Sequence, residues 1–167
     1  MGDIKHLHDS EAIKKIKEIA ENTVCHICTF TEAFSIAARP MHTQQVDDSG
    51  SFWFFSDKDS SLNSQLGEND KVQLLYIQNN KSEYLSIEGT AIISKDQGKI
   101  DELWSGWAKT WFTGGKEDPN LTLIEVMPAN GYYWDTQHGK MIQLIKIAAG
   151  ALTGRTMDDG LEGKLKI

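Results

Sequence analysis

The segment from Ala37 to Ser64 constrains the fold of this chain more than any other. It contains an apolar run that ends at Arg39–Met41, a turn sequence at Asp47–Gly50 and the aromatic run Phe52–Phe55. Two β-prone runs on either side of such a turn predict an antiparallel hairpin. The second run breaks into Ser56–Ser61, which predicts a charged, hydroxyl-rich loop that caps a helix.

The same hairpin predicts a binding site for a phosphorylated, planar ligand. The guanidinium of Arg39, serine hydroxyls and helix-start N–H groups can bind an anion beside a wall of flat side chains. Flavin mononucleotide (FMN) suits such a surface. Two small alanines before Arg39 and the rigid Pro40 would let a ligand come close, which favours a binding role for this arginine. Ser56 and Ser60 also fit as turn and cap residues, and a helix cap is where a phosphate would bind.

Composition limits the classes of partner. The 167 residues suit a single domain, residues 1–167, and 40% hydrophobic with 25% charged residues support a folded core. The net charge of −7 argues against nucleic acid, which needs an excess of Lys and Arg. The first twenty residues lack the apolar stretch of a signal peptide, and no apolar run is long enough to span a bilayer. We therefore expect a cytoplasmic protein that does not use a membrane.

The sequence Cys25–Cys28 has C-x-x-C spacing, which suggests a redox pair or a metal site. The surrounding residues 23–31 look like a strand, on which positions i and i+3 face opposite sides, roughly 10 Å apart. That separation exceeds the reach of a disulfide. A zinc site would need two more ligands, and the five histidines show no ligand spacing. We expect two free thiols and no metal.

The remaining patterns predict a mainly β fold. Beside the aromatic run we expect strands at residues 24–31, 35–46, 72–78, 84–89, 121–127 and 131–135, with a break at 128–130. We expect helices that start at Asp9, at Ser60 or Ser61 and at Asp96, the last continuing to Trp111, and a helical run at 141–152. The tail from residue 153 is glycine-rich and loosely organised. These elements predict a small closed β-barrel with flanking α-helices.

Three tryptophans, Trp104, Trp107 and Trp111, fall on one face of the helix expected after Asp96. Packing in the core or in a dimer is the simpler interpretation of this stripe. The alternative is that Trp107, Trp111 and Phe112 form a lid near a flavin ring. Both interpretations stay open at the level of the sequence.

The chain resembles the pyridoxamine-phosphate oxidase-like superfamily of flavin-binding split barrels, and within it the small general stress proteins. Five segments carry the resemblance in order along nearly the whole chain: Ala38–Met41, Phe52–Ser60, Tyr84–Ala91, Leu103–Phe112 and Tyr132–Asp135. The resemblance implies a split β-barrel of the FMN-binding type. It also implies a homodimer with two flavin sites at the subunit interface, which take FMN or FAD.

The resemblance assigns candidate cofactor residues. In such proteins the arginine strand, the aromatic strand and the following loop hold the phosphate and ribityl chain, which transfers to Arg39, Pro40, Met41, Phe55, Ser56, Asp57 and Ser60. Lys58 is a candidate cation in the same loop, and Trp134 matches a late-strand tryptophan that approaches the flavin. The oxidase branch continues the loop with a basic pair, where this chain has Ser61 and Leu62. The usual cationic phosphate clamp is therefore missing.

The sequence thus predicts a dimeric flavin-binding protein of the general stress type, and a flavin-dependent oxidoreductase that uses a small electron donor or acceptor. The basic residues that bind pyridoxal phosphate in the oxidases have no clear counterpart around His138 and Lys140, so a true pyridoxamine-phosphate oxidase is not expected. No catalytic residue is identified, because no nucleophile–base constellation is visible. Two alternatives remain: a non-catalytic flavin-binding or sensing module, and the same barrel with haem or a deazaflavin.

Overall fold

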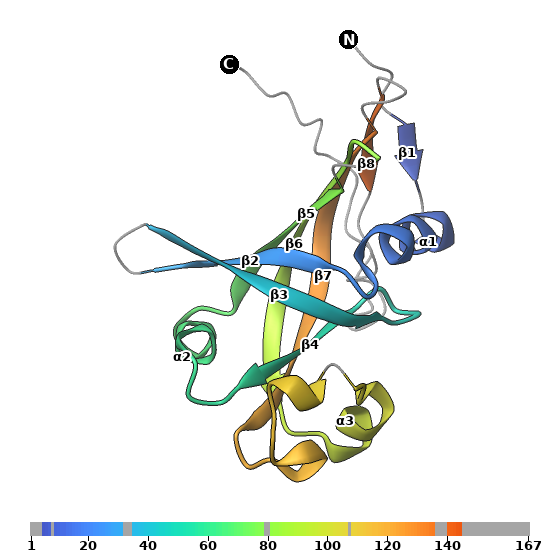
Figure 1. The fold of residues 1–167 in the computed structure, drawn as a ribbon. Helices are drawn as coiled ribbons and strands as arrows, with labels where there is room; N and C mark the ends of the chain where they lie inside the picture. Colours follow the sequence, from blue (N-terminus) through green and yellow to red (C-terminus); the bar gives the residue numbers. More distant parts are fainter. Residues whose placement is uncertain are drawn as a thin grey trace, which may run out of the picture.

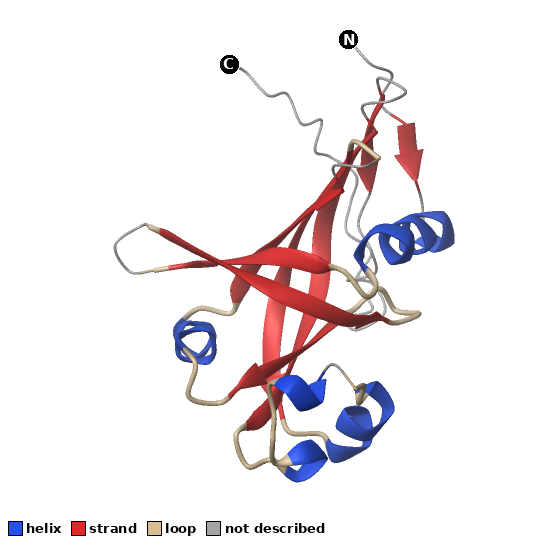
Figure 2. Cartoon of the chain, viewed as in Figure 1, coloured by secondary structure: helices blue, strands red, loops and turns tan. Residues whose placement is uncertain are grey.

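The centre of the molecule is a β-barrel with helices around it (Figures 1 and 2). A computed structural model describes residues 5–7, 9–31, 35–78, 81–106, 108–135 and 140–144. The strands are β1 (Lys5–Leu7), β2 (Val24–Phe30), β3 (Ile36–Val46), β4 (Phe52–Asp57), β5 (Lys71–Gln78), β6 (Glu83–Ser94), β7 (Leu121–Asp135) and β8 (Lys140–Leu144). The helices are α1 (Asp9–Ala20), α2 (Ser61–Glu68) and α3 (Gln97–Leu103), with short 3-10 helices at Ala108–Thr110 and Gly115–Glu117.

The strands form one sheet in the order β1-β8-β7-β4-β3-β2-β5-β6. A further antiparallel pairing of β6 with β7 closes six strands into a barrel, and β8 and β1 extend the sheet beyond β7. The expected mainly β barrel with flanking helices is therefore confirmed. Within the described residues, no helix combines the length and apolar character that crossing a membrane requires.

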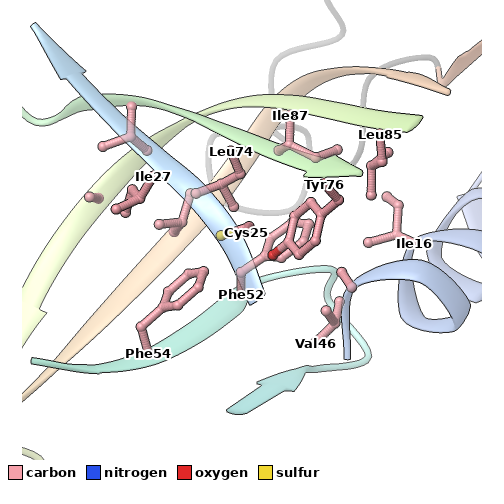
Figure 3. Close-up of a cluster of buried hydrophobic side chains, with 14 of the residues drawn as sticks. Ile16, Cys25, Ile27, Val46, Phe52, Phe54, Leu74, Tyr76, Leu85 and Ile87 are labelled. Carbon is pink, nitrogen blue, oxygen red and sulfur yellow. The ribbon is translucent and has the colours of Figure 1, made fainter. Parts of the chain in front are cut away.

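Alternate side chains of the strands fill the barrel interior (Figure 3). Strand side chains with almost no solvent exposure include Phe52, Phe54, Leu74, Tyr76, Leu85, Ile87 and Tyr133. Helix α1 adds Ile16 and Ile19 to this cluster, and α2 adds Leu62 and Leu66, so both helices pack onto the barrel core. Burial of each such side chain contributes roughly 1.5–3 kcal/mol before the entropy cost of folding is counted.

A second apolar cluster lies outside the barrel wall, between β4, β7, α3 and the 3-10 helix Ala108–Thr110. Its buried members are Phe55, Ile100, Leu103, Ala108, Phe112, Leu121 and Leu123. Side chains alternate along β4, so Phe54 faces the barrel interior while Phe55 faces this outer cluster. The cluster therefore fixes Phe55 and Phe112 on the outside of the barrel.

The two cysteines follow the prediction made from their spacing. Cys25 pairs with Met41 across β2 and β3 and belongs to the barrel core, whereas Cys28 pairs with Ala38 on the opposite face. Both are free thiols. Burial raises the pKa of Cys25 to about 12, although its contacts with Tyr76 and Thr43 act in the other direction. The predicted placement of the two thiols on opposite faces of one strand is thus confirmed.

The helix predicted from Asp96 to Trp111 ends early. Asp96 caps α3, with its carboxylate accepting from the N–H of Lys99 (2.8 Å). Trp104 already has an extended backbone (φ −62°, ψ 120°), and helical geometry returns only at Ala108–Thr110. Ser105 and Gly106, which are weak helix formers, stand at the break. Trp104 and Trp111 therefore do not share a helical face, and that prediction was wrong; Trp107 lies outside the described residues.

The predicted break at 128–130 is also wrong, because β7 runs continuously over Leu121–Asp135. The pairing of β6 with β7 shifts register between Glu88 and Gly89, opposite Pro128. Proline has no backbone N–H, and Pro128 stands at this bulge, so its lack of a donor costs no hydrogen bond of the regular pairing between β6 and β7. A Cβ atom at Gly89 would lie 2.6 Å from a backbone oxygen of β7, so this close approach requires glycine.

The helix predicted at 141–152 is wrong over its first residues. Strand β8 covers Lys140–Leu144 and pairs with β7 in antiparallel register. A short apolar run fits either a helix or a strand, and here the edge of β7 supplies the backbone partners. Residues 145–152 and the tail from residue 153 lie outside the described residues.

Candidate functional site

One pocket, of about 340 Å³, brings together most of the residues that the sequence analysis singled out. It lies where the middle of β3 meets the end of β4, the start of α2 and the 3-10 helix Ala108–Thr110. Eight of the twelve candidate residues line it: Arg39, Pro40, Met41, Phe55, Ser56, Ser60, Trp111 and Phe112. The other lining residues are Val24, His42, Gln44, Ser61, Leu62 and Ala108.

The guanidinium of Arg39 is held by two neutral side chains. Its Nη1 donates to the hydroxyl of Thr29 on β2 (3.1 Å), and its Nη2 donates to Oε1 of Gln65 on α2 (2.8 Å). The Thr29 hydroxyl also donates to Oε1 of Gln65. Because a guanidinium has five N–H donors, these two bonds orient Arg39 and leave donors and its positive charge for an anion.

The start of α2 lines the same pocket. Ser60 is the N-cap: its hydroxyl oxygen accepts from the N–H of Asn63 (3.1 Å), so its own O–H proton remains a donor. Ser61 follows at the first helical position, where backbone N–H groups have no acceptor within the helix. These groups and Arg39 make one end of the pocket suitable for an anion.

Ser56 lines the pocket but uses its hydroxyl proton inside the protein. It donates to Oδ1 of Asn63 (2.9 Å) and lies 2.7 Å from the hydroxyl of Thr122. Asn63 in turn donates to the Thr122 hydroxyl (2.9 Å), which donates to the carbonyl oxygen of Ser56 (3.0 Å). All three side chains are buried. The network ties the start of α2 to β4 and β7, and Ser56 can offer a ligand only an acceptor.

Aromatic and aliphatic side chains form the other walls. Phe55 and Phe112 are buried and meet edge to face, with ring centroids 6.4 Å apart. Met41 and Leu62 complete the apolar lining. Trp111 stands at the rim and is 69% exposed. A flat ring system can pack against such a surface.

Sequence reasoning missed four polar residues of this site. His42 and Gln44 line the pocket, and Nε2 of Gln44 lies 3.0 Å from Nδ1 of His42. Strand alternation was the signal that could have found them, because both lie on the same face of β3 as Pro40. Thr29 and Gln65 carry no local signal, since their contacts with Arg39 depend on how β2 and α2 pack around β3.

Comparison with known proteins identifies the family. The family model described as pyridoxamine 5′-phosphate oxidase like matches residues 11–158. The chain belongs to this family. The resemblance inferred from the sequence is thereby confirmed.

Solved structures of general stress proteins share the fold of this pyridoxamine 5′-phosphate oxidase-like chain. The protein related to general stress protein 26 from Clostridium acetobutylicum has a TM-score of 0.70 and 24% identity, covering 83% of this chain and 96% of that one. The general stress FMN/FAD binding protein from Xanthomonas citri has a TM-score of 0.65 and 26% identity, covering 90% of this chain and 99% of that one.

Curated relatives match over shorter regions. Protein bli-3 of Neurospora crassa is 22% identical over 110 residues, which is 61% of this chain and 53% of the relative. General stress protein 26 of Bacillus subtilis is 38% identical over 45 residues, which is 27% of this chain and 31% of the relative. The chain therefore spans about half of the length of the first relative and about a third of the second.

Three candidate residues of this pyridoxamine 5′-phosphate oxidase-like protein lie outside the described pocket lining. The ammonium of Lys58 is 3.7 Å from the carboxylate of Asp59, and Asp57 accepts from the N–H of Asp59 (2.8 Å). Both Asp57 and Lys58 are exposed. Trp134 stacks on Tyr132 of the same strand, with ring centroids 6.1 Å apart. The chain therefore does not bring these three side chains to the pocket by itself.

Proposed function

We propose that this protein binds FMN, with FAD as the second candidate, in the pocket between β3 and the start of α2. The observation that carries the proposal is that one pocket is lined both by Arg39, which Thr29 and Gln65 orient, with the first residues of α2, and by aromatic side chains. Arg39 and the N–H groups of α2 suit a phosphate. Phe55 and Phe112 suit a flat ring. The Xanthomonas citri relative, described as FMN/FAD binding, supports the same ligand.

The polar groups of the described residues that line the pocket suit one phosphate, but only one of them, Arg39, is a cation. Among the described lining residues Arg39 is the only side chain with a full charge, while Ser61 and Leu62 stand where the family resemblance expects a basic pair. A hydrogen bond to a charged group contributes roughly 1.5–3 kcal/mol, so the missing pair weakens phosphate binding appreciably. We expect FMN to bind reversibly and to be lost in part during purification.

The proposed activity is that of a flavin-dependent oxidoreductase acting on a small electron donor or acceptor. A bound flavin supplies the electron and hydride transfer. The chain's own residues bind and orient it: Met41, Phe55 and Phe112 keep water from one side of the ring. Trp111 at the rim is positioned to cover the open side of a bound ring.

We propose in addition a homodimer that places its flavin sites at the subunit interface. Large apolar side chains of three neighbouring strands are exposed: Val24 52%, Phe30 43%, Ile36 61% and Ile77 55%. The strand registers put all four on the outer barrel face, which continues through Tyr84 to Trp134. Such a face is typical of an interaction surface. Val24 also lines the pocket, so a second copy on this face would lie at the pocket rim and could bring its own Trp134 to the flavin.

The proposed setting is the cytoplasm. The net charge of −7 favours small molecules over nucleic acids as partners.

Titration of the purified protein with FMN and FAD tests the proposed ligand. We expect saturable quenching of flavin fluorescence, with weaker binding by Arg39→Ala and unchanged binding by the control Lys71→Ala, whose side chain is exposed and lies outside the pocket lining. Absence of binding to either flavin, or tight binding of haem instead, would overturn the proposal. Reduction of the bound flavin by nicotinamide cofactors then separates an oxidoreductase from a non-catalytic binding module. Sedimentation as a single 18.7 kDa species would contradict the dimer.

A further inference from the structure

The first turn of α2 differs from a common helix start in the residue at its third position. Ser60 is the N-cap, and Asn63, three residues later, donates its backbone N–H to the Ser60 hydroxyl (3.1 Å). Glu or Gln often stands at this third position, where its side chain bonds back to the N–H of the cap residue. Here the N–H of Ser60 donates to the carbonyl oxygen of Asp57 instead (3.0 Å). The side chain of Asn63 therefore takes no part in the cap.

That side chain fastens the helix start to the barrel. Nδ2 of Asn63 donates to the hydroxyl of Thr122 on β7 (2.9 Å), and its Oδ1 accepts from the hydroxyl of Ser56 on β4 (2.9 Å). Thr122 pairs with Ser56 across the two strands and donates to the Ser56 carbonyl oxygen (3.0 Å). All three side chains are buried, so water does not readily replace a lost partner. Thr122 thus holds the first turn of α2 against the barrel wall.

We propose that Thr122 is a positioning residue for the phosphate of the ligand. The N–H groups of Ser61 and Leu62 have no acceptor within the helix, and both residues line the pocket. An anion bound there needs these N–H groups held to within about 0.5 Å of the productive geometry. Thr122 lies outside the pocket lining and acts through Asn63. Because this role uses the phosphate position proposed above, the inference rests on the proposed function.

Comparison of FMN with riboflavin, which lacks the phosphate, isolates this role. Both affinities are measured by fluorescence quenching, and their ratio is the preference for FMN. Thr122→Val keeps the shape of the side chain and removes the hydroxyl. We expect it to lower the preference for FMN about threefold to tenfold, as for one neutral hydrogen bond, with the riboflavin affinity unchanged.

Thr122→Ser separates positioning from stability. It keeps the hydroxyl and loses a buried methyl group, so the free energy of unfolding should fall. The preference for FMN should nevertheless stay at the wild-type value, because the hydrogen bond with Asn63 remains. A hydroxyl that served only the fold would not produce this separation.

The matched control is the same substitution at Thr43. This residue is also buried, and its hydroxyl lies 2.7 Å from the hydroxyl of Tyr76, away from α2. Thr43→Val should lower the free energy of unfolding, because it removes the partner of a buried hydroxyl. It should leave the preference for FMN unchanged, because Thr43 lies outside the pocket lining.

A second variant, Asn63→Ala, removes the same link from the side of α2 and provides the test if Thr122→Val does not fold. It should also lower the preference for FMN. In the double variant the preference should fall no further than in the more affected single variant, because both residues act through one hydrogen bond.

The outcomes distinguish this inference from the proposed function. If the wild type binds neither flavin, or binds FMN and riboflavin alike, the proposed phosphate site fails and the inference with it. If the wild type prefers FMN and the folded variants Thr122→Val and Asn63→Ala keep that preference, only the inference is overturned. Equal weakening of both flavins in Thr122→Val, or an equal loss of preference in Thr43→Val, would assign Thr122 to the fold alone and would also overturn it.

Discussion

Two helices pack onto the barrel core, and each has a cation beside it, but the two cations have different surroundings. At α1, the ammonium of Lys15 donates to the carboxylate of Glu83 (2.9 Å) and lies 4.8 Å from the ring centre of Tyr133. At α2, the guanidinium of Arg39 donates to the neutral Thr29 and Gln65. In the described part of the chain, no carboxylate pairs with Arg39.

This difference separates a cation that supports the fold from one that is available to a ligand. Glu83 also accepts from the hydroxyl of Tyr133 (2.7 Å). At α1, therefore, the carboxylate of Glu83 balances the charge of Lys15 and accepts hydrogen bonds from both Lys15 and Tyr133. At α2 the guanidinium of Arg39 is also held by two hydrogen bonds, yet no carboxylate among the described residues balances its charge. A pocket next to an oriented, unbalanced guanidinium favours an anionic ligand.

Gln65→Glu should have the largest effect, because it gives Arg39 a carboxylate of its own and copies the arrangement at α1. We expect FMN to bind about tenfold to a hundredfold more weakly, since the new carboxylate competes with and repels the phosphate. The free energy of unfolding should stay the same or rise. Fluorescence titration and denaturant unfolding measure the two quantities. Ser64→Glu adds the same charge on the exposed side of α2 and is the control; equal FMN affinity in both variants would refute the role given to Arg39.

Glu83→Gln should do the opposite, lowering stability without changing ligand binding. The change removes the charge that pairs with Lys15, and we expect the free energy of unfolding to fall by about 1–2 kcal/mol, because the pair is only partly buried. FMN affinity should be unchanged, because Glu83 lies outside the pocket lining. A clear loss of FMN binding in a folded Glu83→Gln variant would show that the two clusters are not independent.

The Glu83 pair also predicts a pH dependence. Burial raises the pKa of Glu83, but the hydrogen bonds from Lys15 and Tyr133 outweigh it, so the pKa in the folded state lies below the ordinary value of 4.5. A carboxyl group with a lowered pKa adds stability above its ordinary pKa and loses it as the pH falls through the folded value. The stability gap between wild type and Glu83→Gln should therefore be constant near neutral pH and shrink below about pH 4.5. A gap that persists in acid would show that the pair acts by packing alone.

Trp111→Ala should have the smallest effect of these three substitutions. The side chain is 69% exposed, so its removal should leave the free energy of unfolding nearly unchanged. If it covers a bound ring, FMN affinity should fall by about twofold to fivefold, as for one aromatic contact. Identical titration curves for variant and wild type would remove Trp111 from the site.

Patterns between neighbouring residues predicted the strands and the helix cap that surround the site, but they did not predict the tertiary contacts within it. The hairpin of β3 and β4 and the Ser60 cap follow from turn chemistry, strand alternation and capping, which depend on neighbours in sequence. The length of α3 was overestimated because a tryptophan stripe fits a helix, although Ser105 and Gly106 break it. The contacts that orient Arg39 join β2, β3 and α2, so no short segment of sequence could reveal them.

The central claim is that Arg39 binds the phosphate of a flavin, and comparing FMN with riboflavin tests it most directly, since the two differ only in that phosphate. The account predicts that the wild type binds FMN about tenfold to a hundredfold more tightly than riboflavin. In Arg39→Ala the affinity for FMN should fall to that for riboflavin, while riboflavin binds both proteins equally. A wild type that binds the two flavins alike, or a preference for FMN that survives in Arg39→Ala, would contradict the account.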